Sequence, residues 1–277
     1  MTLLPVPEPY DFAFSTERFR RFGPDLANLW HEGGLHRVVG GREVRIEVVP
    51  GGVSVEPLVD DETWGEVSTL LGLGFDLGGF AEFARDRDPA LAELVERLSG
   101  YRPPIGPDPF ETLVTSITAQ QVSLASAFAI RSRMIERLGE RAVHAYAFPT
   151  RERLAAAEPA ELTAVGFSGR KAEYVIGLAR ADLDYDDLSR LDDDEVKARL
   201  VAVRGLGEWT ADWFLARHLA RPQAWPAGDL GLRKAVGAFY GDGSMPSIEE
   251  VRVLGARFEP FQNLTAHYLL AGLYLAP

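Results

Sequence analysis

Residues 203–211 read Val203-Arg204-Gly205-Leu206-Gly207-Glu208-Trp209-Thr210-Ala211 and contain the most informative pattern of the sequence. An apolar helical stripe leads into it, and a second helix is expected directly after Gly207. Two glycines two positions apart allow a tight turn with positive φ, and they leave room for a phosphate to approach backbone N–H groups. The N-terminus of the second helix adds unpaired N–H groups and a partial positive charge. The stretch therefore predicts a helix-hairpin-helix at about residues 196–219 that binds phosphate through backbone amides, although a Gly-x-Gly turn alone is also typical of an ordinary helix C-cap.

The charge of the chain restricts how it can contact nucleic acid. The 277 residues suit two domains, or one domain with a smaller appendage, and 46% of them are hydrophobic. The formal net charge of −12 argues against binding through bulk electrostatics. Any contact with DNA must therefore use a few local groups, such as the backbone amides of the hairpin.

Several classes of protein are excluded by what the sequence lacks. It has no cysteine, which excludes disulfides, thiolate nucleophiles, zinc fingers and iron–sulfur clusters. No apolar run reaches the ~18 residues of a membrane helix. The start, MTLLPVPEPYDF, has no basic flank and is unlike a secretory signal. We therefore expect a cytoplasmic protein with no membrane partner.

The first 84 residues are expected to form a small antiparallel α+β unit. Residues 36–58 are typical of strands, because apolar and charged residues alternate from Val44 to Val48. Gly40-Gly41 and Gly51-Gly52 are two-residue turn signals between such runs, so hairpins are predicted. A helix is expected before them, from Ser15 to Trp30.

From residue 85 onward the pattern is nearly all helical. Apolar residues recur at spacings of three and four, and glycine or proline marks short connections. The expected helices span residues 91–98, 110–117, 124–138, 151–157, 159–164, 170–182, 194–203, 208–219, 230–240, 248–258 and 262–275.

The hairpin and three further segments resemble the helix-hairpin-helix base-excision DNA glycosylases. Asp229 follows Trp209 by 20 residues in a Pro-rich loop that opens a helix, and the family carries its essential aspartate at this spacing. The segment from Asp108 to Gln121 resembles the family's first helix and wedge loop, and residues 166–172 resemble its Gly-x-x-x-x-Lys-Ala segment. The resemblance covers about residues 105–240. Arg204 is a departure, since proline is usual there.

Within this superfamily the sequence most resembles the 3-methyladenine DNA glycosylase II family. That family also has an additional N-terminal domain, which opens here with Pro9-Tyr10-Asp11-Phe12, and lacks iron–sulfur cysteines. The resemblance implies an α+β fold: a small antiparallel N-terminal α+β domain (residues 1–84), then a mostly α-helical, two-lobed helix-hairpin-helix glycosylase domain (residues 85–277). It also implies a monomer that binds double-stranded DNA containing damaged bases and requires no cofactor.

The implied reaction is monofunctional excision of alkylated bases. A lyase of this superfamily has a Schiff-base lysine where Trp209 stands. Bases such as 3-methyladenine and 7-methylguanine are cationic, which weakens the glycosidic bond. Asp229 is expected to stabilise the oxocarbenium-like charge and to orient or deprotonate water. An aspartate after glycine is also a common helix N-cap, and the two roles are compatible.

The flipped base is expected to lie in a pocket of Trp209, Trp213, Gln120 and Leu270. The two tryptophans are spaced i, i+4 and share a helix face, although core aromatics show the same spacing. Leu270 stands where the family often places another tryptophan, and residues 260–263 lack its usual Arg-Ser pair, so a roomier pocket is expected. Gln121 matches the wedge that fills the gap left by the base, although two solvated loop glutamines would look the same.

The resemblance also assigns roles to the hairpin. Arg204, Gly205, Gly207 and Thr210 are expected to bind DNA phosphate. The backbone carbonyls of Val201, Val203 and Leu206 are expected to bind a structural monovalent cation.

Three other functions are compatible with parts of the sequence. One is a glycosylase for oxidised or mismatched bases, although a neutral base needs a proton donor and none but Asp229 is evident. A second is a non-catalytic helix-hairpin-helix DNA-binding protein, against which the spacing of Asp229 argues. The third is a helical interaction scaffold, which the acidic net charge mildly favours.

Overall fold

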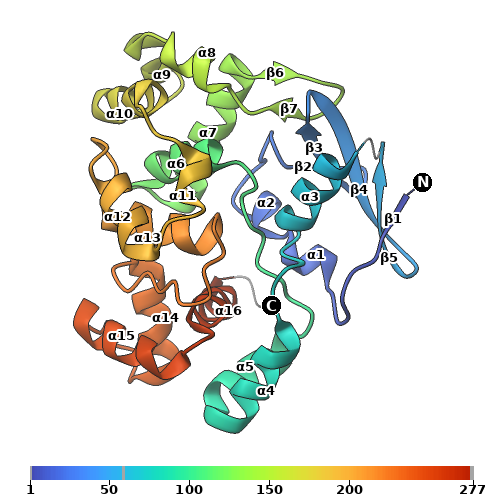
Figure 1. Cartoon of the computed structure of the whole chain (residues 1–277), viewed down its shortest axis with the longest axis vertical. Coiled ribbons are helices and arrows are strands. Elements are labelled where there is room, and N and C mark those ends of the chain that lie inside the picture. The colour runs from blue at the N-terminus through green and yellow to red at the C-terminus, as the bar shows by residue number, and fades with distance from the viewer. Residues whose placement is uncertain (1, 58–59, 275–277) are drawn as a thin grey trace.

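A computed structural model describes residues 2–57 and 60–274 and places a small sheet beside two groups of helices (Figure 1). The sheet has five antiparallel strands in the order β1-β5-β4-β3-β2. Their bounds are β1 Thr2–Leu4, β2 Leu29–His31, β3 Gly34–Val39, β4 Arg42–Val49 and β5 Gly52–Glu56. The inward side chains of Leu35, Val44 and Ile46 are fully buried. The predicted antiparallel N-terminal sheet is thus confirmed, and side chains from its strands pack into one core.

Both predicted hairpins are present, but the turn of the second lies one residue earlier than the glycine pair suggested. Gly40 and Gly41 join β3 to β4, and both have positive φ. The next turn is formed by residues 50 and 51, because Gly52 already pairs with Val49. The glycine pair at 51–52 therefore marks the β4–β5 hairpin but lies one residue past its turn.

The predicted helix from Ser15 to Trp30 is wrong. The structure has two short helices, α1 Phe12–Ser15 and α2 Arg18–Arg21, and the chain then enters β2. Gly23 has φ of 116°, and the following proline cannot donate the N–H that a helix needs. Asp25 then accepts the N–H groups of residues 27 and 28 and turns the chain. The sheet is covered by α3 Asp61–Leu70, which the sequence analysis did not predict.

The chain from residue 85 onward is mostly helical, as predicted, apart from the short pair β6 Glu140–Arg141 and β7 Tyr146–Ala147, whereas the helices at 77–87 and 185–188 were not predicted. The helices of the first lobe are α6 Pro109–Ala119, α7 Leu124–Leu138, α8 Arg151–Ala155, α9 Pro159–Ala164, α10 Gly169–Arg180, α11 Tyr185–Leu188, α12 Asp193–Val201 and α13 Glu208–Arg217. The second lobe contains α4 Leu77–Arg87, α5 Pro89–Arg97, α14 Leu230–Tyr240, α15 Ile248–Gly255, the 3₁₀ turn η1 Ala256–Phe258 and α16 Gln262–Tyr274. Each lobe has its own apolar core, and none of the helices described is long and apolar enough to span a membrane.

The second lobe begins earlier than the boundary expected after residue 84. That position lies inside α4, whose Leu77, Phe80 and Ala84 belong to the core of the second lobe. The chain therefore leaves the N-terminal domain before residue 77, since a helix packed into one core cannot be divided between two domains.

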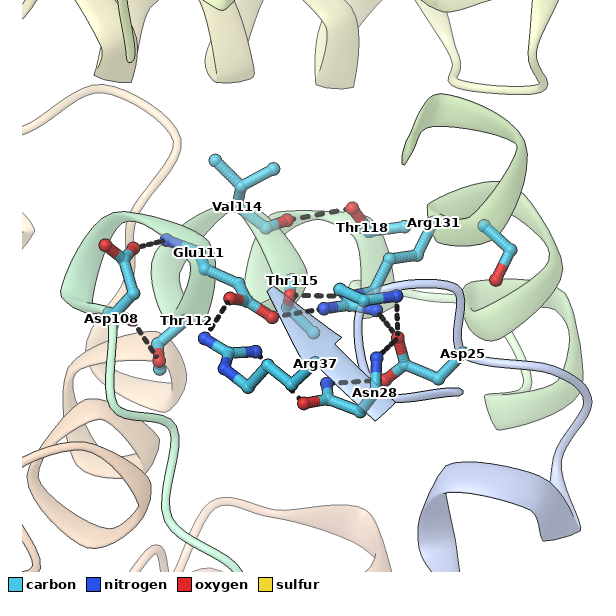
Figure 2. Close-up of polar contacts among 12 residues, drawn as sticks. Asp25, Asn28, Arg37, Asp108, Glu111, Thr112, Val114, Thr115, Thr118 and Arg131 are labelled. Atoms are coloured by element: carbon cyan, nitrogen blue, oxygen red, sulfur yellow. Dashed lines mark hydrogen bonds and ion pairs between the residues drawn. The ribbon is translucent and has the colours of Figure 1, made fainter. Parts of the chain in front are cut away.

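A buried ionic network fixes the N-terminal domain to the first lobe (Figure 2). Arg37 of β3 donates to Glu111 of α6 at 3.0 Å and to Asn28 at 3.0 Å. Arg131 of α7 bonds to both Glu111 and Asp25, so both guanidiniums of the network have acidic partners. All five side chains line a cavity between the two domains, and the network holds its walls in place.

Candidate active site

The hairpin connects α12 to α13, and only its first glycine needs to be glycine. Gly205 has φ of +100°, and a Cβ added there would lie 2.4 Å from Cγ of Tyr174. Gly207 has φ of −119° and is the N-cap of α13, so the expectation of positive φ at both glycines is wrong. A Cβ at Gly207 would meet nothing within 4 Å. The helix start is thus open on this side, and its first N–H groups have no acceptor within the helix.

Two hairpin side chains differ in their access to a phosphate. Arg204 is exposed and forms a loose ion pair with Glu173 at 3.3 Å. A solvated pair of this kind contributes little stability, so a phosphate can displace Glu173. The side chain of Thr210 is buried, which leaves only its backbone N–H for the predicted phosphate contact.

The two glutamines of the α6–α7 loop point in different directions. Gln120 donates from Nε2 to the carbonyl of Gly205 at 2.9 Å, so its amide ties this loop to the hairpin. The described lining of the cavity between the domains includes neither Gln120 nor Leu270, so their place in a base pocket stays a prediction. Gln121 is exposed with φ of 55°, a conformation that non-glycine residues rarely adopt. Gln121 therefore stands at the tip of the loop, as a wedge requires, next to the exposed apolar side chains of Val122 and Leu124.

Asp229 precedes the first residue of α14 in the second lobe and lies beside α13, the hairpin helix of the first lobe. It is the N-cap of α14, and its Oδ1 accepts the N–H of Leu232 at 2.8 Å. Its Oδ2 accepts the indole N–H of Trp209 at 2.7 Å and that of Trp213 at 3.0 Å. The carboxylate is thus held in one orientation by three N–H donors.

The two tryptophans connect Asp229 to the cavity between the domains. Both line this cavity of about 120 Å³, together with residues of α2, α6 and α7. Trp209 is partly exposed, whereas Trp213 is only 2% exposed. The guanidinium of Arg217 covers the ring of Trp213 at 3.7 Å from its centroid. Trp209 is therefore the tryptophan that a base can stack on, and Trp213 mainly holds Asp229.

Leu270 and Tyr274 of α16 flank the aspartate loop. Cδ2 of Leu270 lies 3.0 Å from the position of a Cβ at Gly231, and Cε2 of Tyr274 lies 3.4 Å from it. Burial and the charge of Asp229 raise the pKa of Tyr274. Sequence reasoning missed Tyr274, which lies one helical turn after Leu270 and so shares its helix face.

The hairpin also offers backbone carbonyls for the expected cation. The carbonyl of Val203 accepts the N–H of Leu206 at 3.0 Å, which leaves one lone pair for a metal ion. Side chains offer no alternative site, since the described residues contain no group of three or more histidines or carboxylates arranged to hold a metal. The cation therefore stays a prediction that rests on the carbonyls of Val201, Val203 and Leu206.

The fold and this site together define a two-lobed helix-hairpin-helix protein with a capping aspartate beside the hairpin. Residues 114–258 match the family described as HhH-GPD superfamily base excision DNA repair protein. The match spans more than half of the chain, so the chain belongs to that superfamily.

Individual relatives agree with this assignment. The chain is 27% identical over 245 residues to a DNA-3-methyladenine glycosylase of Bacillus subtilis, covering 86% of this chain and 80% of that one. Its structure resembles that of a 3-methyladenine DNA-glycosylase from Archaeoglobus fulgidus, with a TM-score of 0.87, 25% identity and coverage of 100% and 99% of the two chains. It also resembles a 3-methyladenine DNA glycosylase from Schizosaccharomyces pombe in complex with abasic DNA, with a TM-score of 0.64, 25% identity and coverage of 72% and 98%.

Proposed function

We propose that this chain is a DNA glycosylase that excises alkylated bases, of the 3-methyladenine and 7-methylguanine type, from double-stranded DNA. The observation that carries the proposal is the carboxylate of Asp229, held by two indole N–H groups and a helix N-terminus beside an open hairpin. Relatives that share most of this chain bear the name DNA-3-methyladenine glycosylase, which supports the same substrate class.

The hairpin and the wedge loop would hold the damaged duplex. The open N-terminus of α13 presents N–H groups to a phosphate, while the exposed Gln121 enters the stack as the base turns out. The base would stack on Trp209, at a gain of about 1–3 kcal/mol. The bond from C1′ to the base then breaks, and the base leaves with the electron pair. Asp229 stabilises the positive charge left on the sugar and orients the water that attacks C1′.

We further propose that the enzyme has no lyase activity. The sequence contains three lysines, and each is accounted for away from the cavity. Lys171 donates to the carbonyl of Thr118 at 2.9 Å, Lys197 pairs with Asp212 at 2.7 Å, and Lys234 is exposed on α14. A Schiff base with C1′ needs an amine at the site, and Trp209 stands where a lyase lysine would.

Release of free bases from methylated DNA tests the activity. Chromatography of the supernatant should show 3-methyladenine or 7-methylguanine, with the DNA strand intact until alkali is added. Borohydride should trap no covalent enzyme–DNA adduct. Absence of any released base would contradict the proposed glycosylase, whereas a trapped adduct would contradict only the monofunctional mechanism.

A further inference from the structure

The wedge loop, residues 120–123 between α6 and α7, has little packing of its own. Residues 121–126 are all exposed, and Gln121 has φ of 55°, a conformation that residues other than glycine rarely adopt. An exposed loop with one residue in a disfavoured conformation relaxes unless contacts from outside the loop hold it. These contacts therefore decide whether Gln121 is ready to enter a duplex.

Two side-chain hydrogen bonds attach the wedge loop, and the helix end before it, to distant parts of the first lobe. Gln120 donates from Nε2 to the carbonyl of Gly205 in the hairpin at 2.9 Å. Lys171 of α10 donates from Nζ to the carbonyl of Thr118 in the last turn of α6, also at 2.9 Å. The first bond fixes the loop to the hairpin, and the second fixes the chain shortly before Gln121.

The ammonium of Lys171 is compensated by the carbonyl end of α6. Within the described parts of the chain it has no carboxylate partner, and burial lowers the pKa of Lys171. Removing an ammonium from water is costly unless a partner compensates for it. The last carbonyls of a helix lack partners within the helix and carry a partial negative charge, which an ammonium satisfies. Lys171 therefore fixes the point at which α6 ends and the wedge loop begins.

Lys171 is placed to act on the wedge loop and not on the bond that breaks. It does not belong to the described lining of the cavity beside the tryptophans, and the donors to Asp229 are other residues. On the far side of the loop, the hydroxyl of Ser123 accepts the N–H of Ser126 at 3.2 Å and caps α7. The chain on both sides of Gln121 is thus fixed at a helix end. A loop held in this way need not be ordered when DNA binds.

We propose that Lys171 is a positioning residue, which holds the wedge loop so that Gln121 enters the duplex as the damaged base turns out. This inference rests on the glycosylase activity proposed above. Base flipping costs the stacking and pairing of the target base, and a wedge that fills the gap offsets this cost. A preset loop fills the gap without first being ordered, so it speeds flipping. Loss of the bond from Lys171 should therefore slow base flipping and leave cleavage of an already unpaired base nearly unchanged.

Two duplexes separate base flipping from cleavage. Both carry 7-methylguanine next to 2-aminopurine, whose fluorescence rises when its neighbour leaves the stack. In the paired duplex the lesion faces cytosine, and in the unpaired duplex it faces an abasic site, where it turns out at lower cost. Stopped-flow fluorescence with the paired duplex measures flipping. Single-turnover release of 7-methylguanine from the unpaired duplex measures cleavage.

The variants test one hydrogen bond at a time. Lys171→Met keeps a long side chain but removes the donor, and Lys171→Arg keeps a donor and the charge. Arg180→Met is the matched control, because Arg180 also lies on α10 and donates to the carbonyl of Ala155 at the end of α8, at 2.8 Å. Gln121→Ala, alone and combined with Lys171→Met, tests whether Lys171 acts through Gln121. Thermal unfolding verifies that each variant is folded.

We expect Lys171→Met to slow the fluorescence change roughly tenfold, as is typical for the loss of one hydrogen bond from a charged group. Release from the unpaired duplex should stay within about twofold of the wild type, because the donors to Asp229 are intact. Lys171→Arg should recover most of the flipping rate, and Arg180→Met should behave as the wild type. In the Gln121→Ala background, Lys171→Met should have little further effect.

An unchanged flipping rate in Lys171→Met, or equal losses with the two duplexes, would overturn the inference and leave the proposed function standing. Additive effects of Lys171→Met and Gln121→Ala would also overturn it, because independent effects would show that Lys171 does not act through Gln121. Release of no base from either duplex by the wild type would contradict the proposed function and, with it, this inference.

Discussion

The indole nitrogen of Trp209 donates a hydrogen bond to Oδ2 of Asp229 at 2.7 Å, across 20 residues of sequence. This bond joins the hairpin helix of the first lobe to the helix N-terminus of the second. The residue proposed to stack on the base therefore also orients the proposed catalytic carboxylate. Trp209 thus couples the position of the base to the position of the Asp229 carboxylate, whose charge would stabilise the sugar.

Replacing Trp209 by phenylalanine should separate these two roles. The ring remains available for stacking, but Asp229 loses one of its two indole donors. A hydrogen bond to a charged group contributes about 1.5–3 kcal/mol, so we expect the single-turnover rate to fall roughly tenfold or more, with little change in DNA affinity. A rate like that of the wild type would show that the bond does not orient Asp229.

The two hairpin glycines should respond differently to alanine. Gly205→Ala forces positive φ on alanine and drives its Cβ into Tyr174, so it should lower both the melting temperature and the affinity for DNA. Gly207→Ala meets open space and should leave stability within about 1 kcal/mol of the wild type while weakening DNA binding, because the new methyl group stands where a phosphate would approach. Thermal melts and binding to a duplex with an abasic site measure both effects. Equal loss of stability in the two variants would contradict this account of the turn.

The network between the domains predicts a large effect of Glu111→Gln. Glu111 accepts from Arg37 and Arg131, and all three side chains are buried. Removing one charge leaves two guanidiniums undercompensated, so the free energy of unfolding should fall by about 3–5 kcal/mol. Urea denaturation measures the loss. Glu249→Gln, which breaks the exposed pair with Arg252, is the control and should change stability by less than about 1 kcal/mol.

Stability should also fall as the pH is lowered from 7 to 5. Burial, with the charges of Arg217 and Arg18, holds the pKa of His267 well below its ordinary value. The unfolded chain binds a proton at this histidine below pH ~6.5 and the folded chain does not, so acid favours unfolding by up to about 1.4 kcal/mol per pH unit. His267→Gln should flatten the dependence of the unfolding free energy on pH in this range. An unchanged slope would contradict a neutral, buried His267.

Much of the fold could be predicted because periodicity reports burial directly. The stripes of α6 and α7 and the alternation in β4 name mostly buried residues, although Leu124 of α7 and Val48 of β4 are exposed. The predicted helix at 15–30 was wrong because its apolar spacing continues across Gly23, where the backbone turns. The segment after β5 lacked a strong pattern, and α3 was missed.

The site was predicted less completely, because contacts between residues far apart in the sequence leave no local sequence pattern. Asp229 and Trp209 could be found by their spacing, and the structure brings them together. The bond from Gln120 to the carbonyl of Gly205 joins residues 85 positions apart, and nothing in the sequence reveals it. Arg217 follows Trp209 and Trp213 at i+8 and i+4 on one helix face, which is a signal that could have found it.

The role of Asp229 is tested by the rate at which Asp229→Asn releases 3-methyladenine from a lesion-containing duplex. Asparagine can keep the helix N-cap at Leu232, so the variant should fold and bind abasic-site DNA. We predict a single-turnover rate lower by about 10²–10⁴-fold, because the charge opposite the sugar is lost. Asp192→Asn, the same change at the N-cap of α12, should keep the wild-type rate. A rate for Asp229→Asn equal to that of the wild type would contradict the central claim that this carboxylate carries the reaction.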